Sequence, residues 1–200
     1  MNPLNSIWGT IVAGVVLAVA IGLAVDGVNF SDLTFIVWVH VLAGIVWIGL
    51  LYYFNFVQVP ALAAAAADSG GPGGAGISKY VAPRALAWFR WGAVVTWLSG
   101  AAALLRYGIF DDAFLLGLNE NAPGNAWVIG VGAWLGTIML FNVWVLIWPN
   151  QKKVLGLVEA SANEINRARR TAFLASRTNT MLSVPMLASM VGYGHTGFFI

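Results

Sequence analysis

The sequence predicts an all-α integral membrane protein, because three features of its composition and pattern agree. Hydrophobic residues make up 60% of the 200 residues, charged residues make up only 9%, and the mean hydropathy is +0.80. A water-soluble domain of this length needs more polar surface than that. The apolar residues form five long runs, and most basic residues lie on one side of those runs. The lipid bilayer is therefore the expected partner, and we expect no nucleic acid partner.

Each of the five runs is long enough to cross the hydrocarbon layer as a helix. About 20 residues, at about 1.5 Å per residue, span the roughly 30 Å of hydrocarbon. A helix is expected because a lone strand would leave its backbone groups without partners in lipid. Polar residues inside the runs, such as Asn55, Thr96, Ser99, Asn142 and Ser183, are expected to join neighbouring helices by hydrogen bonds. The sequence predicts one transmembrane domain over residues 1–200, with spans at about 6–25, 34–57, 87–107, 127–148 and 179–200.

Two connections between the runs have distinct compositions. The tract 63–76 consists mainly of alanine and glycine, which predicts a flexible linker. The segment 150–177 is rich in lysine and arginine and carries Val154, Val158 and Ile165 at near-helical spacing. This pattern predicts a basic helix along the membrane surface, between the fourth and fifth spans. A role in topology and headgroup contact explains its charge without a ligand site.

The distribution of basic residues predicts the orientation of the chain. Cytoplasmic loops of membrane proteins carry an excess of lysine and arginine. The N-terminus is therefore predicted to be cytoplasmic and the C-terminus to face outward. The first run is read as a retained helix, because no lysine or arginine precedes it. Nine of the ten basic residues fall on the side of the N-terminus and leave Arg106 alone opposite: Lys79, Arg84, Arg90, Lys152, Lys153, Arg167, Arg169, Arg170 and Arg177.

The two histidines are the candidates for metal chemistry, because the chain has no cysteine. The lack of cysteine excludes disulfides, thiolate metal sites and covalent haem attachment within these residues. Counting from the span boundaries at about 1.5 Å per residue places His40 about 9 Å and His195 about 7–8 Å below the outer boundary. Two imidazoles at matched depth on different helices are typical of axial ligands of a b-type haem. A helix-to-helix hydrogen bond is the alternative for each histidine.

Small and basic residues near the histidines extend this hypothesis. Gly44 lies four residues after His40 and Gly192 three residues before His195, so each shares the face of its histidine and leaves room for a flat macrocycle. Arg106 lies near the same depth and is a candidate partner of the haem propionates. An arginine that snorkels at a helix end is the alternative for Arg106. No residue pattern identifies a catalytic group.

Five blocks of the sequence resemble the N-terminal membrane domain of PuuD-type bacterial urate oxidases (urate hydroxylases). They are WVHVLAGIVWIG at 38–49, YYFNFVQVP at 52–60, RALAWFRWGA at 84–93, NVWVLIWPNQKK at 142–153 and SRTNTMLSVPM at 176–186. The resemblance implies a bacterial inner-membrane location, a purine substrate such as urate, and electron transfer to a C-terminal, external cytochrome c domain. This sequence has no Cys-x-x-Cys-His segment, so the resemblance here covers the membrane domain, and we expect a separate cytochrome c.

The Trp-x-His opening of the second run, at Trp38 and His40, is also similar to the membrane protoporphyrinogen oxidase family, which handles b-type haem. Together these observations lead to the hypothesis of an inner-membrane redox protein that binds haem b and passes electrons to a cytochrome c or a larger redox complex. Urate oxidase-like activity would follow from the resemblance. The alternative hypothesis is a haem-free structural subunit of a larger respiratory or photosynthetic complex.

Overall fold

The computed structural model describes residues 2–25 and 31–195, and every regular element within these residues is helical, as predicted. Three helical segments among the described residues are long and apolar enough to cross a membrane: Ile7–Ala24, Asp32–Ala67 and Ala126–Val154. They coincide with the first, second and fourth predicted spans. The third predicted span and residues 179–194 of the fifth are also helical, but their composition is more polar, so the count of five spans stays a prediction. The chain divides into two compact units, Met1–Phe35 and Ile36–Ile200.

The N-terminal unit contains a short 3-10 turn, η1 (Pro3–Asn5), and helix α1 (Ile7–Ala24). Ser6 begins α1, because its hydroxyl accepts a hydrogen bond from the Gly9 N–H at 3.0 Å. This bond satisfies one of the free N–H groups at the start of a helix. None of the α1 side chains is buried within this unit, as expected for a helix that is surrounded by lipid.

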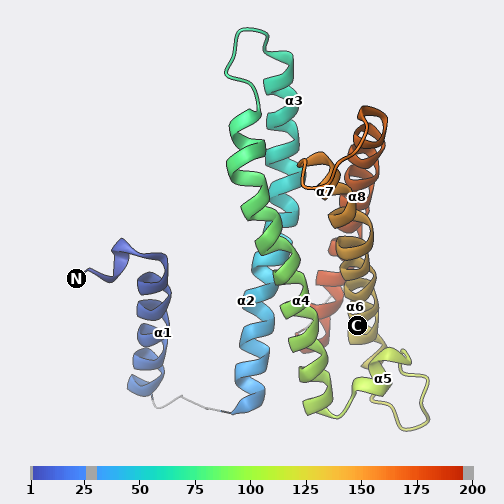
Figure 1. The fold of residues 1–200 in the computed structure, drawn as a ribbon. Helices are drawn as coiled ribbons and strands as arrows, with labels where there is room; N and C mark the ends of the chain where they lie inside the picture. Colours follow the sequence, from blue (N-terminus) through green and yellow to red (C-terminus); the bar gives the residue numbers. More distant parts are fainter. Residues whose placement is uncertain (1, 26–30, 196–200) are drawn as a thin grey trace. The chain divides into compact units, whose positions relative to one another are not determined.

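The first helical segment of the second unit, which starts at Asp32 in the last residues of the first unit, turns back into another long segment (Figure 1). Helix α2 (Asp32–Tyr52) continues through a π-helical turn η2 (Tyr53–Gln58) into α3 (Val59–Ala67). The return segment consists of the π-helical turn η3 (Ile77–Val81) and helix α4 (Ala82–Tyr107). The predicted linker is shorter than expected, because α3 includes the alanines up to Ala67 and only residues 68–74 lie outside a helix.

A short helix and a second long segment follow. Helix α5 (Phe110–Phe114) lies against α6 (Ala126–Phe141), where the indole N–H of Trp134 donates to the Phe114 carbonyl at 3.0 Å. Helix α6 then continues through the π-helical turn η4 (Asn142–Ile147) into α7 (Trp148–Val154).

Each π-helical turn directly precedes a proline in the first turn of the next helix. These prolines are Pro60, Pro83 and Pro149. Proline has no N–H and its ring clashes with the carbonyl four residues earlier, which in each case belongs to the π-helical turn. The wider turn lets the helix continue past the proline without a break.

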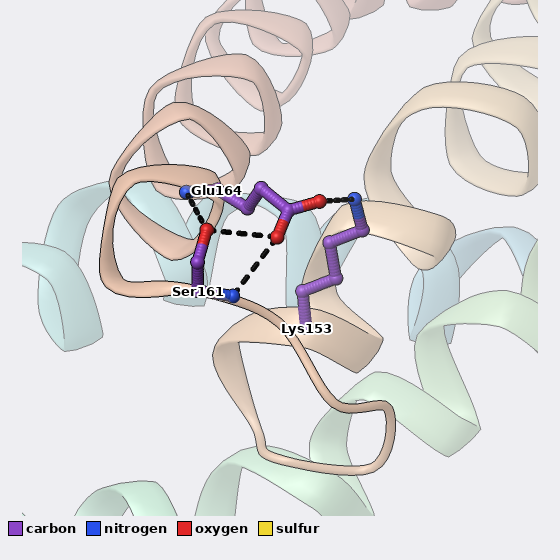
Figure 2. A network of polar contacts seen from close by, with 3 residues as sticks. All are labelled: Lys153, Ser161 and Glu164. Atoms are coloured by element: carbon purple, nitrogen blue, oxygen red, sulfur yellow. Dashed lines mark hydrogen bonds and ion pairs between the residues drawn. The ribbon is translucent and has the colours of Figure 1, made fainter.

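Helix α8 (Ala162–Gly194) is the longest element among the described residues. It begins at a capping box, in which the Ser161 N–H and hydroxyl donate to Glu164 Oε2 at 2.9 and 2.8 Å, and Lys153 of α7 lies 3.7 Å from the other carboxylate oxygen (Figure 2). Such a box satisfies free backbone donors at the helix start.

The predicted basic surface helix is not a separate element. Lys152 and Lys153 end α7, whereas Arg167, Arg169 and Arg170 belong to α8, which continues without interruption into the fifth predicted span. The inner face of this basic part is buried at its alanines, so it packs against the unit along its length. The last part of the fifth predicted span, residues 196–200, lies outside the described residues.

The core of the second unit joins all its long segments. Helix α6 packs along α8 (Figure 1), and α2 meets α4 where Gly92 lies against the backbone of Ala43 and Trp47. The buried apolar side chains form one main cluster: Trp47, Ile48, Leu51, Phe54, Leu86, Phe89, Ala93, Met139, Val143, Ile147, Ala175 and Met186.

Candidate functional site

His40 lies on α2 and its half-buried imidazole faces α4. Its Nδ1 atom is 2.8 Å from the carbonyl oxygen of Thr96. Because a carbonyl only accepts, Nδ1 carries the proton and donates, and the lone pair of the neutral ring is on Nε2. The Thr96 carbonyl is the one hydrogen-bond partner of this side chain among the described residues. An Nδ1–H that donates to a backbone carbonyl is the usual second contact of a metal-ligating histidine.

Two glycines make room for this arrangement. A Cβ atom on Gly100 of α4 would lie 2.8 Å from the Cε1 atom of His40, so only glycine lets the ring lie against α4 here. A Cβ atom on Gly44 would lie 3.7 Å from the Thr96 methyl group, an ordinary contact. Gly44 therefore belongs to the α2–α4 contact, one turn along from His40, and a larger side chain than alanine would separate the helices.

His195 and Gly192 lie at the other end of the chain. His195 directly follows α8, and its backbone N–H donates to the Val191 carbonyl at 3.0 Å. Its side chain is exposed, whereas Gly192 is buried in α8. Nearby, Tyr193 packs on the small cluster formed by Leu104, Ile109, Ala113, Ile129 and Ala133.

Arg106 lies in the last turn of α4 and is exposed. The helix ends at Gly108, whose φ of 71° is left-handed, a conformation that glycine adopts without strain. The structure thus places His40 and Gly44 on α2, Arg106 on α4, Gly192 on α8 and His195 directly after α8. The described contacts of His40 run to α4 and those of His195 run to its own helix. The pairing of the two histidines stays a prediction.

A polar network connects α8 with two of the three π-helical turns, η2 and η4, and with the end of α2. The Asn142 amide donates to Asn179 Oδ1 at 2.8 Å, and the Asn179 amide donates to the Met139 carbonyl at 3.0 Å. Asn55 of η2 donates to Ser176 Oγ at 2.8 Å, and the hydroxyls of Tyr52 and Ser183 are 2.9 Å apart. The prediction that polar residues join helices is confirmed at Asn55, Asn142 and Ser183. The hydroxyls of Thr96 and Ser99 instead bond to their own helix.

Sequence reasoning missed the two groups that orient His40. The Thr96 carbonyl is a backbone atom, so no side chain type could have indicated it. Gly100 is followed by three alanines, and in that context it looked like one more small residue for helix packing. One signal was available in the sequence. Gly100 lies eight residues after Gly92, a spacing that puts both glycines near the side of α4 that contacts α2.

The comparison with protein families decides the relationship of the chain. The model of the urate oxidase N-terminal family matches residues 28–122 and 113–199. The chain belongs to the urate oxidase N-terminal family. No curated protein and no solved structure matches it. The matched residues include His40 and His195, so both candidate ligands lie inside the part of the chain that carries the urate oxidase N-terminal relationship.

Proposed function

We propose that this chain is a membrane redox protein that binds haem b through His40, with His195 as the second axial ligand. The observation that carries the proposal is the hydrogen bond from His40 Nδ1 to the Thr96 carbonyl. It fixes the tautomer in which Nε2 keeps its lone pair, and it holds the ring in one orientation. Gly100 supports that orientation by its lack of a side chain.

The cost of a histidine in a membrane span supports a functional role. A polar group in the hydrocarbon layer is expensive unless it has a partner, and such groups are by default candidates for function. His40 satisfies Nδ1 through α4 but leaves Nε2 without a hydrogen bond among the described residues. A purely structural histidine gains most when both nitrogens are satisfied. The open nitrogen is therefore the atom we assign to iron.

The proposal of His195 as the second ligand is based on its position at the end of α8. The His195 side chain is exposed at the end of α8 and takes part in none of the side-chain hydrogen bonds among the described residues. Buried Gly192 lies one turn before it. Arg106, exposed in the last turn of α4, is the proposed partner of the propionates.

The family relationship supports the choice of redox partners. Bound haem would supply one-electron transfer. We propose a separate cytochrome c as the electron acceptor and a purine such as urate as the reductant. The proposed location is the bacterial inner membrane, with the basic loops in the cytoplasm.

Haem content tests the proposal. The chain is purified in detergent after expression with haem supply, and its haem is quantified for the wild type, His40→Ala and His195→Ala. We expect about one haem per chain in the wild type and loss in both variants. If only His40→Ala loses its haem, the chain still binds haem through His40, but a residue other than His195 is the second ligand. If the wild type is colourless and instead copurifies with a larger complex, the structural-subunit hypothesis takes its place.

Electron transfer is measured in the same preparations. Urate is added to the wild-type protein with oxidised cytochrome c, and reduction of the cytochrome is followed by absorbance. We expect reduction that depends on both urate and His40. If the protein contains haem but urate does not cause reduction of cytochrome c, the chain is still a haem-binding redox protein, and urate is excluded as its reductant.

A further inference from the structure

Arg90 is a cation in a predicted span, and among the described residues its guanidinium lies beside aromatic rings. It lies on α4, is half-buried, and its guanidinium carbon is 3.3 Å from the centre of the Trp148 ring and 6.0 Å from that of Trp144. Its Nε atom is buried and makes no hydrogen bond among the described residues. The haem proposal does not use this residue.

A second cation shares the same indole. Lys152 of α7 has its Nζ atom 5.9 Å from the Trp148 ring centre. Among the described residues, neither Arg90 nor Lys152 lies within ion-pair distance of a carboxylate, whereas the next lysine, Lys153, pairs with Glu164 at 3.7 Å. An indole face reduces but does not neutralise the charge of a nearby cation, so both residues keep a positive charge that no carboxylate among the described residues balances.

An anion between α4 and α7 would resolve this arrangement. The planar guanidinium presents paired donors that match a phosphate, and lysine adds a point charge. Trp88 and Trp91 on the same part of α4 are exposed, as tryptophans are at the level of lipid headgroups. Basic sites between helices at a headgroup level are typical sites for anionic lipids.

We propose that Arg90 and Lys152, held over Trp148, bind the phosphate of an anionic phospholipid headgroup. A lipid is favoured over free phosphate because Trp88 and Trp91 beside the site are exposed, and exposed tryptophans are typical of the headgroup level of a membrane. The site goes beyond the haem function and is independent of it.

Lipid retention tests the site. The full chain is purified in detergent, incubated with phosphatidylglycerol or with neutral phosphatidylcholine, and its bound lipids are counted by native mass spectrometry. We expect phosphatidylglycerol to bind more tightly to the wild type. Arg90→Gln and Lys152→Gln are each expected to weaken that binding about fivefold, the effect of one cation near an anionic lipid surface. Phosphatidylcholine binding should not change.

Arg84→Gln is the matched control. Arg84 lies on the same helix, is exposed, and donates to its own Tyr80 carbonyl at 2.6 Å. An equal loss in Arg84→Gln would overturn the site, because it would show an effect of overall charge. Unchanged phosphatidylglycerol binding in Lys152→Gln would also overturn it, even if Arg90→Gln failed to fold. Displacement of the lipid by millimolar inorganic phosphate, but not by matched chloride, would assign the site to free phosphate instead.

Discussion

At the scale of single residues, the environment of His40 combines features that the sequence shows and features that it hides. Its position within a span follows from counting, because span length is set by bilayer thickness. Its tautomer does not, because it depends on a carbonyl 56 residues away in the chain. Contacts between residues far apart in sequence are decided by helix packing, which the apolar pattern alone leaves open.

Replacing Gly100 by alanine is expected to displace the His40 ring. The new Cβ would lie 2.8 Å from Cε1, and overpacking of this kind costs about 1–3 kcal/mol of unfolding free energy. Alanine's higher helix propensity returns at most about 1 kcal/mol. Equilibrium unfolding in mixed micelles measures the difference. Gly49→Ala on α2 is the control, since its Cβ would meet no atom within 4 Å. Equal effects of the two substitutions would contradict the packing described here.

The buried pair Asn142 and Asn179 is expected to be energetically coupled. Each single alanine variant leaves a buried polar group without its partner, at a cost of about 1–3 kcal/mol. A double-mutant cycle should therefore give a coupling energy of about 0.5–2 kcal/mol, the range for hydrogen bonds between membrane helices. Ser99→Ala, which removes a bond within one helix, should change stability by less. A coupling near zero would show that the network contributes little.

At the scale of elements, the sequence predicts helices well and their boundaries poorly. Within the described residues, each of the five apolar runs forms a helix over most of its length, because in lipid a single segment must satisfy its own backbone. The predicted basic helix merged with the fifth run, since the capping box at Ser161 begins a helix and no later residue ends it before Gly194. Pro185 lies inside α8 and does not stop it.

The start of α8 is expected to depend on pH through Glu164. Hydrogen bonds from Ser161 and the charge of Lys153 hold the pKa of Glu164 below its ordinary value of 4.5 (Figure 2). The stabilisation by Glu164 is therefore complete above pH 4.5 and is lost as the pH falls through the lower pKa of the folded state. The protection of the first-turn amides of α8 against hydrogen exchange, taken relative to their intrinsic exchange rate at each pH, should fall across that range. Glu164→Gln should remove the dependence, and Glu159→Gln should keep it; a dependence that persists in Glu164→Gln would assign it elsewhere.

At the scale of the whole molecule, charge asymmetry predicts the topology. Nine of ten basic residues lie on one side of the predicted spans. Three of them, Lys79, Arg84 and Lys152, contact aromatic residues or carbonyls of η3 and α7, at the end of the second unit that also carries α3. How the two units lie in one membrane depends on lipid as well as on the chain, so it calls for a direct measurement.

The absence of cysteine makes that measurement direct. Two single-cysteine variants, Ser69→Cys and Asn121→Cys, provide the labelling sites. Ser69 lies in the loop 68–74 and Asn121 in the loop between α5 and α6, and both residues are exposed. In intact cells, a thiol reagent that does not cross the inner membrane should label Asn121→Cys and leave Ser69→Cys unlabelled until the membrane is opened. Labelling of both, or the reverse pattern, would contradict the predicted orientation.

The reduced-minus-oxidised visible spectrum of the purified wild-type chain, recorded beside His40→Ala, shows whether His40 binds haem. We expect a b-type spectrum in the wild type that is lost in His40→Ala, because Nε2 of the oriented imidazole is the assigned iron ligand. A wild-type chain without haem absorption, or a spectrum unchanged in His40→Ala, would contradict it.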